Sequence, residues 1–165
     1  MEIKRDYYLN ELVDRLDNGL IKIITGIRRC GKSYLLNTIF KNYLIEQGIE
    51  ENHIIQLSLD ERNNLKYLNP DTLDEYIRSL IIDEKKYYLL LDEIQEVTEF
   101  ESVLIGFMHI NNVEIYVTGS NSKFLSSDIV TEFRGRGDEI RIYPLSFSEF
   151  YSVYDGSEEK ALSEY

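Results

Sequence analysis

The chain has 165 residues, of which 43% are hydrophobic and 29% charged, a composition that fits one folded domain and excludes an intrinsically disordered chain. No apolar run approaches the roughly 20 residues of a membrane-spanning helix. The N-terminal segment is too polar for a signal peptide and a single cysteine excludes an internal disulfide, so we expect a cytoplasmic protein without a membrane partner. The net charge is −12, and only the first 45 residues are net basic, so binding to nucleic acid is not indicated.

Five short apolar runs alternate along the chain with segments of helical periodicity. This alternation predicts an α/β fold in which helices flank a mainly parallel five-stranded sheet. The third run has little alternation of polar and apolar residues, so we expect it to be buried on both faces. The predicted strands are residues 20–25, 54–59, 87–92, 113–119 and 139–143.

Two of the intervening segments have one clear apolar face. The segment before the first predicted strand presents Leu9, Leu12, Val13 and Leu16. The segment that follows residue 33 is expected to stop at Gly48, and it presents Leu35, Leu36, Ile39, Phe40, Tyr43 and Leu44.

Three further helix starts are predicted from the spacing of a capping box. The pairs are Thr72 with Glu75, Thr98 with Glu101, and Ser146 with Glu149. We expect one domain over residues 1–154. Residues 155–165 are polar, and we interpret them either as a frayed tail or as the start of a further C-terminal region.

The segment GIRRCGKS, residues 26–33, leaves the first predicted strand and opens a helix. It matches G-x-x-x-x-G-K-[ST], in which backbone N–H groups and a helix N-terminus bind phosphate. Lys32 would reach the β- and γ-phosphates, and the Ser33 hydroxyl would bind Mg²⁺. The sequence therefore predicts a nucleotide site with the contact residues Gly26, Ile27, Arg28, Arg29, Cys30, Gly31, Lys32, Ser33 and Tyr34.

Three residues inside this loop have two interpretations each. Cys30 lies near cations and a helix N-terminus and could be a reactive thiol, but a small residue at this point more often packs. Arg28 and Arg29 could add positive charge beside the nucleotide, or they could be solvated or face a partner.

The segment YYLLLDEIQ, residues 87–95, ends an apolar strand in two adjacent carboxylates. Ligands bind at the carboxyl ends of parallel strands. We therefore expect Asp92 to hold Mg²⁺ and Glu93 to polarise the attacking water, because the phosphate loop makes a surface turn the less favoured interpretation. We expect this strand to lie next to the first one, with the VTGSNS strand beyond it.

Two further segments are candidates for γ-phosphate contacts. Ser120 or Asn121, after the fourth predicted strand, could bind the γ-phosphate or the water, or could form a turn with local capping bonds. Arg134 and Arg136, in FRGRGDEI, could supply an arginine to a neighbouring subunit or could simply be solvated.

Taken in order, GIRRCGKS, LDEIQ, TGSNS and GR followed by YPLSFSEF resemble archaeal and bacterial AAA-type ATPases of the AAA_14 kind over about residues 3–151. The resemblance implies an AAA+ P-loop core that binds ATP and Mg²⁺ through Lys32, Ser33, Asp92 and Glu93. It makes Ser120 or Asn121 look like the first sensor, and Arg136 like the arginine finger with Arg134 as the alternate. It also places KRDYYLNEL near the adenine.

The resemblance also marks a departure, because the helical lid and C-terminal domain of that family would lie beyond PLSFSEFYSVY. Two functions stay open: a magnesium-dependent ATPase core that drives a further domain or a client protein, and a nucleotide-binding switch with little turnover. A GTPase or small-molecule kinase is disfavoured because no N-K-x-D motif is present. A homo-oligomer is expected if an arginine acts between subunits.

Overall fold

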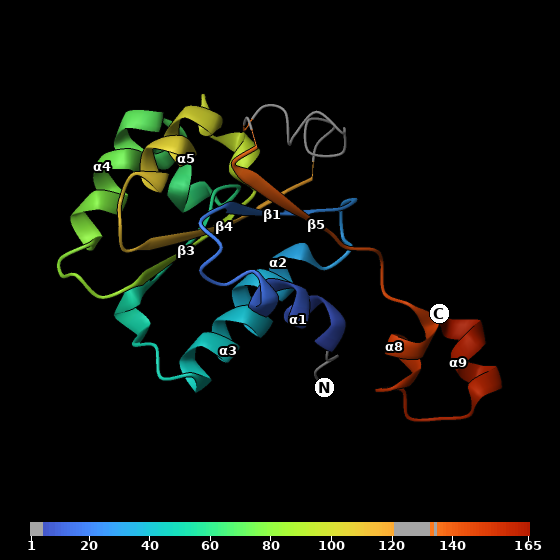
Figure 1. The fold of residues 1–165 in the computed structure, drawn as a ribbon. Helices are drawn as coiled ribbons and strands as arrows, with labels where there is room; N and C mark the ends of the chain where they lie inside the picture. Colours follow the sequence, from blue (N-terminus) through green and yellow to red (C-terminus); the bar gives the residue numbers. More distant parts are fainter. Residues whose placement is uncertain (1–4, 121–132, 134) are drawn as a thin grey trace.

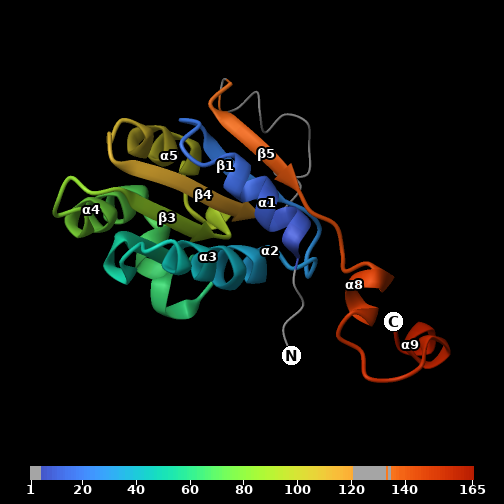
Figure 2. The same ribbon diagram turned by 60° about the horizontal axis from the view of Figure 1, so that its bottom comes forward.

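The computed structural model describes residues 5–120, 133 and 135–165, and its core has three layers (Figure 1). A sheet lies in the middle, and two groups of helices cover its faces (Figure 2). One group consists of α1 (Asp6–Asp14), α2 (Lys32–Tyr34) and α3 (Lys41–Glu46), and the other of α4 (Pro70–Leu80) and α5 (Phe100–Met108).

The sheet contains five strands in the order β2-β3-β4-β1-β5, and every neighbouring pair is parallel. We call the edge at which the strands end the carboxyl edge, and the edge at which they begin the amino edge. Both the parallel sheet and the flanking helices confirm the predicted fold class. The strands are β1 (Ile21–Thr25), β2 (Ile54–Ser58), β3 (Tyr87–Asp92), β4 (Val113–Gly119) and β5 (Gly137–Arg141).

The order of the strands differs from the sequence-based expectation in one respect. β3 does not lie next to β1, because β4 lies between them, with Ile23 of β1 opposite Val117 and Leu91 of β3 opposite the same residue. Strand order depends on long-range packing of apolar faces, and two buried strands look alike locally. β5 also starts two residues earlier than predicted, at Gly137.

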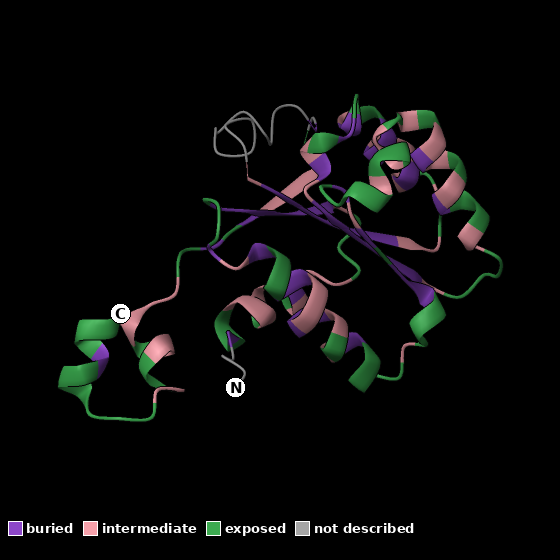
Figure 3. Cartoon of the chain, turned by 180° about the vertical axis from the view of Figure 1, so that it is seen from behind, coloured by how far each residue is buried: buried purple, intermediate pink, exposed green. Residues whose placement is uncertain are grey.

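The sheet is buried between two apolar cores, one on each face, and its strands are largely buried in Figure 3. Leu89 and Leu91 belong to the core under α4 and α5, whereas Tyr88 and Leu90 belong to the core under α1 and α3. All six residues of β3 are buried, which confirms the expectation for this strand. Such burial on both faces is what holds a parallel sheet in the middle of a three-layer fold.

Short helical turns complete the connections. A π-helical turn, η1 (Leu35–Phe40), joins α2 to α3, and Gly48, with a φ of +91°, follows α3 as predicted. Within the described ranges, no helix is long and apolar enough to cross a membrane. The remaining turns are 3₁₀-helical: η2 (Glu51–His53), η3 (Arg62–Leu68) and η4 (Ile94–Glu96).

Of the three predicted capping boxes, one is correct. Ser146 accepts a hydrogen bond from the backbone N–H of Glu149. At α4 the cap is Asn69, whose side chain accepts two backbone N–H groups, because Pro70 already fits the first helical position. At α5 the preceding residue is Glu99, with a left-handed backbone, so Thr98 is not the cap.

The last two helices, α8 (Phe147–Tyr151) and α9 (Glu158–Glu164), form a pair that stands apart from the three layers in Figures 1 and 2. The expectation of a frayed tail is wrong, because Ser157 caps α9 and Ala161 is fully buried. Tyr165 packs its ring against Phe147 and Phe150. These aromatic contacts order a segment whose polar composition alone predicts a loose end.

Candidate nucleotide site at the carboxyl edge

The phosphate loop, residues 26–33, leaves β1 at the carboxyl edge and leads into α2. Position 26 has no room for a side chain, because a Cβ atom there would lie 2.7 Å from both the Cys30 Sγ and the Ile142 carbonyl oxygen. Gly31 is required by conformation, since its φ is +96°, a left-handed value that side chains disfavour. The two glycines of the motif therefore allow the tight curl that precedes α2.

Lys32 is buried within this curl, with 3% of its surface exposed. Its Nζ donates to the carbonyl oxygens of Gly26, at 2.9 Å, and Ile27, at 2.7 Å, and lies 3.7 Å from the Cys30 Sγ. Among the residues that the structure describes, no carboxylate lies within ion-pair distance of this ammonium group. A buried cation without a counter-charge favours an anionic ligand beside it.

Ser33, on the first turn of α2, and Asp92, at the end of β3, lie together at the carboxyl edge. The Ser33 hydroxyl lies 2.9 and 2.8 Å from the two carboxylate oxygens of Asp92 and donates to them. Asp92 ends β3 and is only 4% exposed, whereas Ser33 is exposed on the first turn of α2. A hydroxyl and a carboxylate are thus held together at the mouth of the phosphate loop.

Thr118 of β4 connects the two adjacent acids, and it is a residue that the sequence-based reasoning missed. Its hydroxyl donates to Asp92 Oδ1 at 2.5 Å and accepts the backbone N–H of Glu93 at 2.9 Å. Thr118 is fully buried. A threonine within a strand is common for its β-propensity alone, so the only available signal was its place near the carboxyl end of a strand.

The environment of Asp92 opposes its ionisation. Burial raises the pKa of this carboxyl, while the hydrogen bonds from Thr118 and Ser33 act in the opposite direction. The negative charges of Glu93 and Asp60 raise the pKa further. A cation bound to Asp92 would remove this cost, because it would favour the ionised form.

Glu93 turns away from the strand with a left-handed backbone, at a φ of 57°. Its carboxylate accepts the Ser120 hydroxyl, whose Oγ lies 2.9 Å from Oε2 and 3.2 Å from Oε1, and it also accepts the Gln95 side-chain amide. Ser120 follows β4 at the carboxyl edge. The structure thus brings one of the two predicted sensor residues to the predicted base, and the other, Asn121, lies outside the described residues.

A cavity of about 580 Å³ opens at this edge of the sheet. Six of the predicted contact residues line it together with Glu93 and with two acids, Asp60 and Glu96, that the sequence-based reasoning did not single out. Asp60 lies two residues beyond the end of β2, so the rule that ligands bind at strand ends could have found it. The six residues are Arg28, Arg29, Gly31, Lys32, Ser33 and Tyr34.

Comparison with known proteins agrees with this geometry. The model of the AAA_14 family, described as an AAA domain, matches residues 18–151, which include the phosphate loop, Asp92 and Glu93. The chain belongs to this AAA family. By family and by fold it is an AAA-type ATPase domain.

A relative of this AAA domain, an uncharacterized protein of Haemophilus influenzae, is 36% identical over 149 residues, which cover 90% of this chain and 37% of the relative. The chain spans about a third of the length of the curated relatives that it matches, with shares of 37%, 28% and 30%.

Two solved structures share the fold at low identity. C. elegans PCH-2 superimposes with a TM-score of 0.59 at 16% identity, over 88% of this chain and 41% of that one. Hsp104, solved with ATPγS and FITC casein, gives a TM-score of 0.61 at 11% identity, over 91% and 28%. These likenesses support the P-loop fold of the AAA domain.

Three predicted contact residues of the AAA domain are not among the residues that line the cavity: Gly26, Ile27 and Cys30. Cys30 is 3% exposed and belongs to the apolar core under α1 and α3, where its thiol contacts apolar side chains and the Lys32 ammonium. This position corresponds to the packing interpretation. Ile27 is 55% exposed at the tip of the loop, where its carbonyl oxygen accepts from Lys32.

Arg136 lies at the amino edge of the AAA domain, at the other end of the sheet from the phosphate loop. Its carbonyl oxygen accepts the N–H of Ile21 at 2.8 Å, next to the start of β5, and its side chain is exposed. The five residues of β1 separate the two edges by roughly 16 Å at about 3.3 Å per residue. Arg136 therefore does not reach the site of its own chain, and Arg134 lies outside the described residues.

Proposed function

We propose that this AAA domain binds Mg-ATP at the carboxyl edge and hydrolyses it to ADP and phosphate, and that the cycle drives or switches a further domain or a client protein. One observation carries the proposal. The phosphate loop and Glu93 line a single cavity of about 580 Å³, beside which Ser33 bonds to Asp92, although they come from two separate segments of the chain.

Lys32 and the backbone of the phosphate loop would hold the phosphates. The Lys32 ammonium is already oriented by the Gly26 and Ile27 carbonyl oxygens, and phosphate oxygens are stronger acceptors than these carbonyls because they are charged. Arg28 and Arg29, which line the cavity, would add positive charge at its rim. The phosphates would thus replace the weaker contacts that Lys32 makes within the loop.

Ser33 and Asp92 fit a magnesium ion. Both supply the oxygen ligands that Mg²⁺ prefers, and they lie 2.8 to 2.9 Å apart beside the phosphate loop. Burial raises the pKa of Asp92, and a bound cation would oppose this change because it favours the ionised form. Bound Mg²⁺ would neutralise charge on the phosphate oxygens.

Glu93 would act as the general base. In the reaction a water oxygen forms a bond to the γ-phosphorus while the bond from that phosphorus to the bridging oxygen breaks, and the water proton passes to the Glu93 carboxylate. Ser120 and Gln95 hold this carboxylate by hydrogen bonds, so its orientation is set before a nucleotide enters. The Thr118 hydroxyl would fix the orientation of both acids, because it bonds to the carboxylate of Asp92 and to the backbone N–H of Glu93.

The second candidate, a nucleotide-dependent switch with little turnover, is favoured by one feature. Both groups that would contact the γ-phosphate region are engaged within the chain, Lys32 by loop carbonyls and Glu93 by Ser120. Turnover then requires both sets of bonds to rearrange. The partners implied by either function are ATP, a second copy of the chain that receives Arg136, and a client protein.

Binding and turnover are tested separately. With Mg-ATP at about a hundredfold excess over Kd, we expect stabilisation by about 2.7 kcal/mol, which raises the Tm by roughly 5–10 °C. No rise at millimolar Mg-ATP would reject both functions. Glu93→Gln should keep the rise and lower phosphate release by about 10²–10⁴.

The matched control for Glu93→Gln is Glu96→Gln, because Glu96 lines the same cavity and lies three residues along the chain. We expect this control to release phosphate at nearly the rate of the unsubstituted chain. If the unsubstituted chain binds Mg-ATP but releases no measurable phosphate, the switch replaces the ATPase as the function of this domain.

A further inference from the structure

Arg5 precedes α1 and joins three segments that are far apart in the sequence. Its side chain is 5% exposed. Nη1 donates to the Cys30 carbonyl oxygen at 2.8 Å, and Nη2 donates to the Tyr143 carbonyl oxygen at 2.7 Å. Nε donates to Glu149 Oε2 at 2.7 Å. One guanidinium group thus connects the phosphate loop, the exit of β5 and helix α8.

The charge of Arg5 is balanced on the side away from the phosphate loop. Glu149 supplies the counter-charge, and it is itself held by the Ser146 hydroxyl, whose Oγ lies 3.0 Å from Oε1. The guanidinium carbon also lies 4.5 Å from the centre of the Tyr8 ring. A buried guanidinium group whose three nitrogens each bond to a different acceptor is held in one orientation. The flexible side chain of a lysine does not reproduce this geometry.

The contact with Cys30 acts on the peptide group that links Cys30 to Gly31. This peptide is trans, and in a planar trans peptide the C=O and the following N–H point in opposite directions. Because the Cys30 carbonyl oxygen points to Arg5, the N–H of Gly31 points away from Arg5. Gly31 lines the nucleotide cavity, and backbone N–H groups of a phosphate loop are its phosphate ligands.

Gly31 also fits Arg5 sterically. A Cβ atom at this position would lie 3.2 Å from Arg5 Nη1, closer than an ordinary contact. The glycine therefore serves two needs, the left-handed backbone and the approach of the arginine. Its place in the phosphate loop links the motif to a residue that lies 26 positions earlier.

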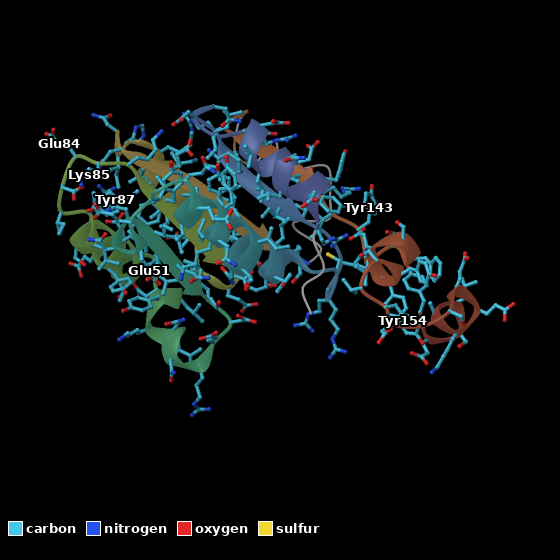
Figure 4. The ribbon with its side chains drawn as sticks, turned by 90° about the horizontal axis from the view of Figure 1, so that it is seen from below. Glu51, Glu84, Lys85, Tyr87, Tyr143 and Tyr154 are labelled. Atoms are coloured by element: carbon cyan, nitrogen blue, oxygen red, sulfur yellow. The ribbon has the colours of Figure 1, made fainter. Side chains whose placement is uncertain are left out.

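Arg5 also contacts Tyr143, which lies on the segment that leads from β5 to the C-terminal helix pair. In Figure 4, Tyr143 lies between the three-layer core and α8. Its carbonyl oxygen accepts from Arg5, and its N–H donates to the Tyr8 hydroxyl at 3.2 Å. Displacement of α8 would therefore act on Arg5 through both Tyr143 and Glu149.

We propose that Arg5 is a positioning residue for the phosphate loop, and that its contacts with Glu149 and Tyr143 make the affinity of the loop for phosphate depend on the position of α8. The inference rests on the proposed binding of nucleotide. It assigns to α8 a regulatory influence on the site, which α8 exerts without touching the ligand.

The test compares Arg5→Met, Arg5→Lys and Glu149→Gln with Arg15→Met. Arg15 is the matched control, since it follows α1 directly and pairs with Glu11 and Asp138 at the amino edge. Kd is measured by calorimetry for Mg-ATP and for magnesium pyrophosphate, at a temperature well below the Tm of every variant. Pyrophosphate separates an effect on the phosphate loop from one on the rest of the nucleotide.

We expect Arg5→Met to weaken both ligands by about tenfold, the loss of one charge-assisted hydrogen bond. Arg5→Lys should recover part of this, and Glu149→Gln should lose roughly threefold. Arg15→Met should leave both Kd values unchanged. In the double variant, Glu149→Gln should add nothing to Arg5→Met, because the two residues act through one link.

Equal Kd values for Arg5→Met and the unsubstituted chain would overturn the inference. An equal loss of binding in Arg15→Met, or a loss for Mg-ATP without one for pyrophosphate, would overturn it as well. If Arg5→Met does not fold, Arg5→Lys and Glu149→Gln provide the same comparison. An unsubstituted chain that binds neither ligand rejects the proposed function itself, a result distinct from normal binding by the Arg5 variants.

Discussion

Lys22 and Lys32 are both almost fully buried, at 1% and 3% exposure, but they lie at opposite edges of the sheet. At the amino edge, Lys22 Nζ lies 3.4 Å from Glu114 Oε1 and 4.7 Å from the centre of the Tyr116 ring. At the carboxyl edge, the Lys32 ammonium group has, among the described residues, only carbonyl oxygens and a thiol as hydrogen-bond partners. The first lysine is matched by a charge of opposite sign, whereas among the described residues the second is not.

This difference separates a structural ion pair from a binding site. Burial lowers the pKa of Lys22, and the carboxylate of Glu114 opposes that change, so the charge of Lys22 is matched within the fold, although both residues also line a smaller cavity of about 220 Å³. Lys32 lines a cavity, where a ligand can supply the missing negative charge. Counter-charge, more than burial, therefore indicates which buried cation serves a ligand.

The largest expected effect concerns the amino edge and tests whether it has a role in catalysis. If Arg136 reaches the γ-phosphate of a neighbouring copy, Arg136→Ala should lower phosphate release by about 10³ or more. Phosphate release per subunit should also rise with protein concentration in the unsubstituted chain. The control is Arg78→Ala on α4, an exposed arginine paired with Asp74. A rate independent of concentration would contradict the role of Arg136 between subunits.

The two lysines can be compared directly by the same substitution. Lys22→Met should cost about 3–5 kcal/mol, because it leaves the buried Glu114 carboxylate without its counter-charge, and should lower the Tm by about 10 °C or more. It should nevertheless keep the rise in Tm with Mg-ATP. Lys32→Met should lose that rise with little change in the Tm of the free chain. The opposite pattern, measured by differential scanning fluorimetry, would reverse the assignment of the two edges.

A smaller effect concerns Asp92 and has a defined sign with pH. Burial raises the pKa of Asp92, so the folded chain holds this proton to higher pH than the unfolded chain does. The free energy of unfolding therefore falls as the pH rises from the pKa of Asp92 in the unfolded chain to its pKa in the folded chain. This loss of stability remains at neutral pH.

Asp92→Asn removes this ionisation and keeps an oxygen that accepts from Ser33 and Thr118. We expect its Tm without nucleotide at pH 7 to exceed that of the unsubstituted chain by about 2–4 °C, equivalent to about 1 kcal/mol. The difference should shrink as the pH falls toward about 4, where an unfolded aspartate is itself half protonated. A less stable Asp92→Asn at pH 7 would show that the carboxylate stabilises the free fold.

The smallest effect is expected for Ser120→Ala. Ser120 orients the Glu93 carboxylate by one hydroxyl, so its loss should lower phosphate release by roughly threefold to tenfold, the effect of about 1 kcal/mol. The Kd for Mg-ATP should not change. Ser79→Ala on α4, which removes a hydroxyl that bonds to the Tyr76 carbonyl oxygen, is the control. A change in Kd would mean that Ser120 contacts the nucleotide.

The site residues that could be predicted from the sequence are those attached to a local pattern. Lys32 and Ser33 belong to a loop motif, and Asp92 and Glu93 end a strongly apolar strand, so each was assigned an edge without any knowledge of the strand order. Because all the strands are parallel, their carboxyl ends meet whatever the order. This explains why the sequence could place these residues at one edge although it did not predict the neighbour of β1.

The residues that were missed act through long-range contacts. Thr118 matters because β4 lies next to β3, and Arg5 because α1 begins beside the phosphate loop and the exit of β5. Neither carries a spacing that marks it, since a threonine in a strand and an arginine before a helix are common. Both residues owe their contacts to elements that are distant in the sequence and adjacent in the fold, and no single segment of the sequence reveals such an arrangement.

The π-helical turn η1 has a consequence for how the length of this chain can vary. Hydrogen bonds in such a turn span five residues, not four, so the turn holds one residue more than an α-helical turn. In a plain α-helix, deletion of one residue rotates everything beyond it by about 100°. Here the deletion of Asn37 or Thr38, the two half-buried positions of the turn, would restore α-helical geometry and keep α2 and α3 in the same relative orientation. The helix that carries Lys32 and Ser33 thus contains a position where evolution can shorten the chain without turning the phosphate loop away from the sheet.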